Sequence, residues 1–257
     1  MIALPVARLP DGWTAGTDTL AGRVILVTGA SGGLGRAVSL ACAAAGASVV
    51  LLGRNVRALE SVYDAIKAAG AAEPAIYPLN LEGASPRDCE GVAAAIERDL
   101  GGLDGVVHAA ARFDGLTPLD VLSAEEWLRV LQVNLTAPFL LMQALLPLLQ
   151  ARVDSAAVFV LDDLERMRRA HWGAYGVAKV GLETLAAILH QEHDAGALRV
   201  HALLPAPMRT ALRKMAWFGE DTRQHPLPDA TAVAVVYLLS AAGMAARGAL
   251  LDLRVTG

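Results

Sequence analysis

Two side chains with complementary acid–base chemistry stand four residues apart in the stretch Tyr175-Gly-Val-Ala-Lys179. If this stretch is helical, residues i and i+4 are neighbours on the helix surface, so the Lys179 ammonium lies close to the Tyr175 hydroxyl. A nearby cation favours the ionised form of a phenol, whose ordinary pKa is about 10, and brings that pKa toward neutrality. The pair therefore predicts a proton donor or acceptor, although the same spacing also occurs on helices that do no chemistry.

A glycine-rich turn follows the first strand that the sequence predicts. Val24-Ile-Leu-Val-Thr28 is a short apolar run rich in β-branched residues, which is typical of a buried parallel strand. It leads directly into Gly29-Ala-Ser-Gly-Gly-Leu-Gly35, and residues 36–45 have the composition of a helix. Glycines permit a tight turn and let backbone N–H groups at a helix start approach a pyrophosphate. The arrangement favours dinucleotide binding over a plain tight turn.

The end of the second predicted strand, residues 48–52, bears on the choice of nucleotide. It is followed by Gly53-Arg54-Asn55, without the acidic residue that would bond the ribose hydroxyls of NAD. An arginine at this point can pair with the 2′-phosphate of NADP. The junction therefore favours NADP(H) as cofactor, with NAD(H) as the alternative. Arg54 could also simply point into solvent without contacting a cofactor.

Strands and helices alternate along the rest of the chain. The pattern predicts helices over residues 56–69, 86–100, 119–149, 171–193, 208–218 and 230–240, and strands over 75–79, 105–109, 156–161, 199–204 and 248–253. Such alternation indicates an α/β fold, with one doubly wound parallel sheet of Rossmann type, about seven strands, and helices on both faces. Residues 1–22 lack periodicity and are interpreted as an N-terminal arm. Residues 23–257 are expected to form a single nucleotide-binding domain.

Composition argues against several other classes of protein. A net charge of −4 leaves no basic excess for nucleic acid, and two cysteines are too few for a disulfide framework or a zinc site. The adjacent carboxylates Asp162 and Asp163 leave a strand on opposite faces, so no metal site is predicted. Apolar stretches such as residues 138–149 are too short to cross a bilayer, and residues 1–6 lack the basic start of a signal peptide. We expect a cytoplasmic protein without a membrane partner.

Together these motifs resemble the short-chain dehydrogenase/reductase superfamily over residues 20–253. The resemblance rests on Thr28-Gly29-xxx-Gly33-x-Gly35, Leu103-Asp104-Gly105, Gln132-Val133-Asn134 and Tyr175-xxx-Lys179, in that order. Phrases such as residues 51–55, 144–149 and 172–175 resemble its YciK-like bacterial branch. The resemblance implies NAD(P)-dependent hydride transfer between an alcohol and a carbonyl of a small-molecule substrate. It also implies homodimers or homotetramers built from the helices near residues 123–150 and 171–193.

The resemblance also assigns roles to individual residues. It makes Tyr175 the general acid of the reduction, and it gives Lys179 two tasks: to lower the Tyr175 pKa and to hold the nicotinamide ribose. It makes Asn134 the anchor of a water in a proton relay. The implied catalytic set is Tyr175, Lys179, Asn134 and Asp162, the last at the position of a serine in the family. The implied cofactor set is Gly29, Ser31, Gly32, Gly33, Leu34, Gly35, Arg54, Asn80, Leu81, Ala109, Ala110, Tyr175, Lys179, Pro205 and Met208.

The serine position is where this chain departs most from the family pattern, because residues 156–174 contain neither Ser nor Thr. An ionised Asp162 only accepts hydrogen bonds, would repel a developing alkoxide and would raise the pKa of Tyr175 against Lys179. A protonated Asp162 could instead donate to a carbonyl, and a carboxylate that points away would do neither.

Three further positions depart from the family pattern. Ala109-Ala110-Ala111 replaces Asn-Ala-Gly, Asn80 replaces an acidic residue, and Pro205-Ala206 replaces Pro-Gly. Each residue present is small or keeps a hydrogen-bond acceptor, so each change alone is compatible with the fold. Together with Asp162 they make a catalytically impaired dinucleotide-binding or scaffold protein the alternative to an active oxidoreductase.

Overall fold

The computed structural model describes residues 4–254, and within them lies one parallel sheet of eight strands in the order β1-β8-β7-β6-β5-β2-β3-β4. The strands are β1 (Val6–Ala7), β2 (Val24–Thr28), β3 (Ser48–Gly53), β4 (Ala75–Pro78), β5 (Gly105–His108), β6 (Ser155–Val160), β7 (Leu198–Leu204) and β8 (Leu250–Asp252). Every residue of the inner strands β2, β5, β6 and β7 is buried, because helices cover both faces. The predicted Rossmann-type α/β fold is confirmed.

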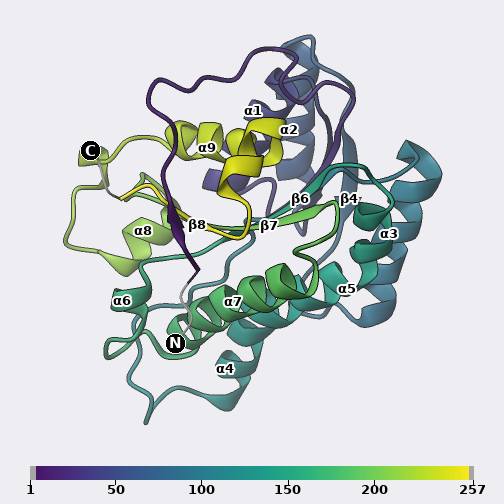
Figure 1. Ribbon diagram of the computed structural model, residues 1–257. Helices are drawn as coiled ribbons and strands as arrows, with labels where there is room; N and C mark the ends of the chain where they lie inside the picture. The colour runs from purple at the N-terminus through teal and green to yellow at the C-terminus, as the bar shows by residue number, and fades with distance from the viewer. Residues whose placement is uncertain (1–3, 255–257) are drawn as a thin grey trace.

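The helices form a layer on each side of the sheet (Figure 1). They are α1 (Gly33–Ala44), α2 (Val56–Ala68), α3 (Pro86–Leu100), α4 (Ala124–Leu131), the π-helical turn η1 (Gln132–Thr136), α5 (Ala137–Gln150), α6 (Leu164–Met167), α7 (Gly173–Glu192), α8 (Ala211–Ala216), the 3₁₀ turn η2 (Thr222–Gln224), α9 (Asp229–Leu239) and the 3₁₀ turn η3 (Ala241–Ala246). One core layer joins the sheet to α3, α5 and α7, and the other joins it to α1, α2 and α9. This sandwich brings the loops that follow the strands to one edge of the sheet.

The N-terminal arm contributes a strand that the sequence did not predict. Val6 and Ala7 pair in parallel with Leu250 and Leu251, so the sheet gains the edge strand β1 and has eight strands instead of about seven. A strand of two residues is too short to carry a periodic signal, and its pairing depends on β8 from the far end of the chain.

The helix predicted over residues 119–149 begins later and contains an irregular turn. It starts at Ala124, where the Ser123 side chain accepts a hydrogen bond from the Glu126 N–H, and it passes through η1 into α5. Pro147 lies inside α5 without ending it. Among the described residues, the continuous helix Ala124–Gln150 is therefore long and apolar enough to cross a membrane by length and composition, contrary to the expectation. Length and composition alone indicate a span only weakly, because core helices of soluble proteins share them and α5 lies in the core layer.

Candidate functional site

A cleft with a volume of about 840 Å³ lies at the carboxyl ends of the strands, where open α/β sheets bind their ligands. Every residue of the predicted cofactor set lines it, and so does Asp162. Asn134, the remaining residue of the predicted catalytic set, is 1% exposed and does not line the cleft. Residues as far apart in the chain as Gly29 and Met208, 179 positions, thus meet at one edge of the sheet, as the alternating pattern predicts.

The glycine turn between β2 and α1 is shaped for close backbone approach. Gly29 has a φ of +66°, and a Cβ on it would lie 2.8 Å from the Ala110 Cα. A Cβ on Gly35 would lie 2.1 Å from the Gly29 carbonyl oxygen, so neither position accepts a side chain without a shift of the backbone. The α1 N-cap, Gly32, makes no side-chain capping bond, which leaves the first N–H groups of the helix for an anion.

Thr28 holds the other wall of this turn in place. Its hydroxyl oxygen accepts hydrogen bonds of 3.1 Å from the backbone N–H groups of both Ala109 and Ala110, and the hydroxyl donates to the Val107 carbonyl at 3.3 Å. The alanines therefore keep the end of β5 against Gly29 without the asparagine that the family has there. The residues present fit the pyrophosphate of a dinucleotide.

Arg54 lies in the same cleft, within a chain of ion pairs that sequence reasoning missed. Its Nη1 atom is 2.6 Å from Glu82 Oε1, and the same oxygen also accepts from Arg112 Nη1. Arg112 Nε lies 2.8 Å from Asp114 Oδ2. Glu82, Arg112 and Asp114 stand shortly after the predicted strands 75–79 and 105–109, and that position was the signal that could have found them.

The helix α7 carries Tyr175 and Lys179 to the cleft, where Asp162 meets them. The Tyr175 hydroxyl donates a 3.0 Å hydrogen bond to Asp162 Oδ2, while Asp162 Oδ1 accepts from the Asp163 N–H at 2.7 Å. Lys179 Nζ donates to the Val160 carbonyl at 2.9 Å and lies 5.6 Å from the centroid of the Tyr175 ring. Asp162 thus faces the phenol as a hydrogen-bond acceptor, which is the first of the three roles that the sequence analysis considered for it.

The electrostatics of this trio differ from the simple expectation for a Tyr–Lys pair. Burial, followed by the charge of Asp162 and the hydrogen bond to it, raises the pKa of Tyr175 well above its ordinary value. The prediction that Lys179 brings this pKa toward neutrality is therefore wrong for this arrangement, whereas the predicted opposing effect of Asp162 is confirmed. Burial lowers the pKa of Lys179 to about 8, although the Asp162 charge raises it.

Asn134 lies in the π-turn η1, and turns of this kind often mark functional sites. Its amide donates to the Arg112 and Val130 carbonyls, both at 2.8 Å, and its oxygen accepts from the Arg112 N–H at 3.2 Å. Both amide N–H groups are thereby committed to backbone carbonyls. The contacts make Asn134 a clamp on the loop after β5.

Aromatic side chains close the end of the cleft next to Tyr175. Trp217, directly after α8, packs against Trp172 with ring centroids 5.4 Å apart, and the Arg213 guanidinium lies 3.9 Å over the Trp217 ring. Phe113 packs edge-on against Tyr175 at 5.2 Å. The helix α8 covers only Ala211–Ala216, which is shorter than the predicted 208–218, and it begins at a Thr210 cap that accepts from the Arg213 N–H. Thr210 thus stops the helix from starting at Met208.

Comparison with known proteins agrees with this geometry. The family model described as short chain dehydrogenase matches residues 23–220. The oxidoreductase YciK of Escherichia coli K12 is 37% identical over 211 residues, which are 82% of this chain and 83% of YciK.

Two solved structures extend the comparison to the fold. A short chain dehydrogenase of Pseudomonas syringae superposes with a TM-score of 0.90 at 39% identity, covering 96% of this chain and 99% of that one. Another from Shigella flexneri, in complex with NADP, has a TM-score of 0.88 at 34% identity and covers 92% and 99% of the two chains. The chain belongs to the short-chain dehydrogenase/reductase family of oxidoreductases.

Proposed function

We propose that the protein is an NADP(H)-dependent oxidoreductase that interconverts a carbonyl and an alcohol of a small-molecule substrate. The observation that carries this proposal is the convergence of Tyr175 and Lys179 with the glycine turn on one cleft. Arg54 in the same cleft, and the NADP held by the Shigella flexneri relative, favour NADP(H) over NAD(H). Bound NADP(H) would supply the hydride that reduces the carbonyl carbon.

The protein's own residues bind the cofactor and transfer the proton. The turn from Gly29 to Gly35 and the start of α1 hold the pyrophosphate, and Arg54 pairs with the 2′-phosphate. Tyr175 gives its hydroxyl proton to the substrate oxygen as the carbonyl is reduced, after turning that proton away from Asp162. Lys179, held by Val160, provides the positive charge that offsets the phenolate left behind.

The hydrogen bond from Tyr175 to Asp162 favours a second candidate, a dinucleotide-binding protein with impaired chemistry. In this arrangement the phenol proton points at a carboxylate, and residues 156–174 contain no Ser or Thr to replace the serine that the family uses on the substrate oxygen. Replacing Asp162 with Ser should then restore activity that the natural chain lacks.

Consumption of NADPH and NADH with a panel of aldehydes and ketones separates the two candidates, with wild type, Tyr175→Phe and Asp162→Ser assayed side by side. The proposed function predicts turnover by wild type and a loss of roughly 10²–10⁴-fold in Tyr175→Phe, the usual size for a general acid. Turnover by Asp162→Ser alone would favour the impaired protein. Tyr175→Phe as active as wild type would overturn the role given to the phenol.

We also propose that the protein is a homodimer or homotetramer assembled through the outer faces of α5 and α7. Phe139 on α5 and Val177 and Ile188 on α7 are 46%, 50% and 48% exposed, and the two α7 residues lie on one face of the helix. Val177→Glu with Ile188→Glu should yield a monomer by light scattering, whereas Val153→Glu, at a fully exposed position outside both helices, should not. An unchanged molar mass in the double variant would contradict this interface.

A further inference from the structure

Glu82 lines the cleft, and the proposed function gives its charge no task. Its side chain is 20% exposed, and one of its oxygens accepts from both Arg54 and Arg112. We propose that Glu82 is a specificity-determining residue that competes with the 2′-phosphate of NADP(H) for Arg54. Glu82 thereby sets how strongly the protein prefers NADP(H) to NAD(H). The inference rests on the dinucleotide site of the proposed function.

The structure holds Glu82 more firmly than it holds Arg54. The Glu82 N–H donates to Asn80 Oδ1 at 3.2 Å, and its carboxylate is bound by Arg112, whose side chain is 22% exposed. The Arg112 backbone is in turn clamped from both sides by Asn134. Arg54, by contrast, is 67% exposed. Arg54 can therefore swing toward a phosphate while the Glu82 carboxylate stays where it is.

The charge balance explains the direction of the effect. An exposed ion pair such as Arg54–Glu82 is worth little by itself, and a phosphate dianion is a stronger partner for the guanidinium. The phosphate must, however, approach within the field of the fixed Glu82 carboxylate, and like charges repel. NAD(H) carries a hydroxyl at this point, which a carboxylate does not repel. Glu82 therefore weakens the binding of NADP(H) and leaves that of NAD(H) almost unchanged.

Equilibrium titration of NADPH and NADH by fluorescence tests the inference without any need for turnover. Glu82→Gln keeps the shape and removes the charge, so it both releases Arg54 and removes the repulsion of the phosphate. It should tighten NADPH by roughly tenfold and leave NADH within about twofold. Glu82→Asp keeps the charge and should not tighten NADPH. Glu73→Gln is the matched control, because Glu73 is ion-paired to Lys67 but lies outside the cleft.

A double-mutant cycle with Arg54→Gln locates the competition. Once Arg54 is absent, only the screened repulsion between Glu82 and the phosphate remains, so adding Glu82→Gln should tighten NADPH by less than about threefold. NADPH binding unchanged by Glu82→Gln, or tightened equally with and without Arg54, overturns the inference while the proposed function stands. Weaker NADH binding in Glu82→Gln would show instead that Glu82 accepts the ribose hydroxyls. If wild type binds neither nucleotide, both proposals fail.

Discussion

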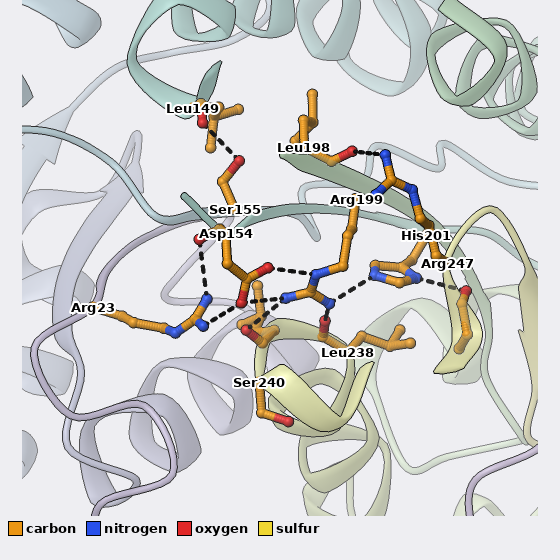
Figure 2. Close-up of polar contacts among 12 residues, drawn as sticks. Arg23, Leu149, Asp154, Ser155, Leu198, Arg199, His201, Leu238, Ser240 and Arg247 are labelled. Atoms are coloured by element: carbon orange, nitrogen blue, oxygen red, sulfur yellow. Dashed lines mark hydrogen bonds and ion pairs between the residues drawn. The ribbon is translucent and has the colours of Figure 1, made fainter. Parts of the chain in front are cut away.

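Buried charges are paired differently at the two ends of the strands, the amino edge and the carboxyl edge of the sheet. At the amino edge, the Arg199 side chain is completely buried and its Nε donates to Asp154 Oδ1 at 2.7 Å, while Arg23 binds the same carboxylate (Figure 2). Arg199 also donates to the Leu238 carbonyl at 2.7 Å. At the carboxyl edge, Lys179 is almost as buried but donates to one backbone carbonyl. Well-paired charges stabilise a fold, whereas underpaired ones with shifted pKa values are typical of sites that do chemistry.

Two buried histidines sharpen the comparison, because burial is the main cause that lowers the pKa of each to about 3. At the amino edge, His201 Nε2 accepts from Arg199 at 3.2 Å, so its Nδ1 carries the proton and donates to the Ala246 carbonyl at 2.9 Å. His108, at the carboxyl end of β5, has no hydrogen-bond partner on either nitrogen within residues 4–254 and stacks on Phe159 at 4.7 Å. The pKa is thus lowered equally in His201, whose two ring nitrogens are hydrogen-bonded, and in His108, whose two ring nitrogens are not.

The largest effect is expected from breaking the charge network at the amino edge. Asp154→Asn leaves the buried Arg199 guanidinium without its counter-charge and should lower the free energy of unfolding by about 3–5 kcal/mol. Asp99→Asn is the control, since the Arg98–Asp99 pair is exposed and should change stability by less than about 1 kcal/mol. Urea unfolding measures both variants. Equal losses in the two variants would contradict the contrast between buried and exposed pairs.

A smaller effect of opposite sign is expected at the carboxyl edge. Lys179→Met removes a buried cation whose pKa burial lowers to about 8, so it should raise the free energy of unfolding at pH 7 by about 2 kcal/mol while it abolishes turnover. The folded wild type loses this proton above pH 8 and the unfolded chain near its ordinary value of 10.5, so wild-type stability rises between these values. The advantage of the variant should therefore shrink from pH 7 to pH 10. A variant that is less stable than wild type at pH 7 would contradict this reading of Lys179.

The smallest effect is expected from the histidines, and it differs in sign between them. His108→Leu removes two unsatisfied nitrogens and should raise stability at pH 7 by about 1 kcal/mol, whereas His201→Leu should lower it by a similar amount because it leaves the Ala246 carbonyl without its donor. Since each folded pKa lies near 3, the unfolded chain binds protons first as the pH falls from 6.5, and stability is lost between pH 6.5 and 3. Each variant should flatten that loss in urea unfolding series. The same sign for both would remove the distinction between the two rings.

Most of the fold could be predicted because its signals are local. The strand Val24–Thr28 and the helix Pro86–Leu100 have the predicted ends, since an apolar run marks the first and the Ser85 capping box and Gly101 mark the second. The strand β1 could not be predicted, because it depends on β8 at the other end of the chain. The π-turn η1 could not be predicted either, since it is stabilised by Asn134 contacts with the loop after β5.

The site divides in the same way. The order and spacing of the motifs predicted that Tyr175, Lys179 and the glycine turn share one cleft, because the strand ends of a parallel sheet lie at one edge. The hydrogen-bond and ion-pair partners of the site residues, by contrast, come from loops that are distant in the sequence. Glu82 reaches Arg54 over 28 positions, and Lys179 bonds Val160 across the strand–helix connection. For this reason the identities of the residues were predicted better than their electrostatics.

The central claim is that Tyr175 delivers a proton beside a dinucleotide that delivers a hydride. The most direct measurement is transfer of deuterium from NADPH labelled at C4 to a carbonyl substrate, followed by mass spectrometry with wild type and Tyr175→Phe. The predicted result is a deuterium on the carbon that bears the new hydroxyl with wild type, and at least about 100-fold less product with Tyr175→Phe at equal NADPH binding. Equal deuterium incorporation by the two proteins would contradict the claim.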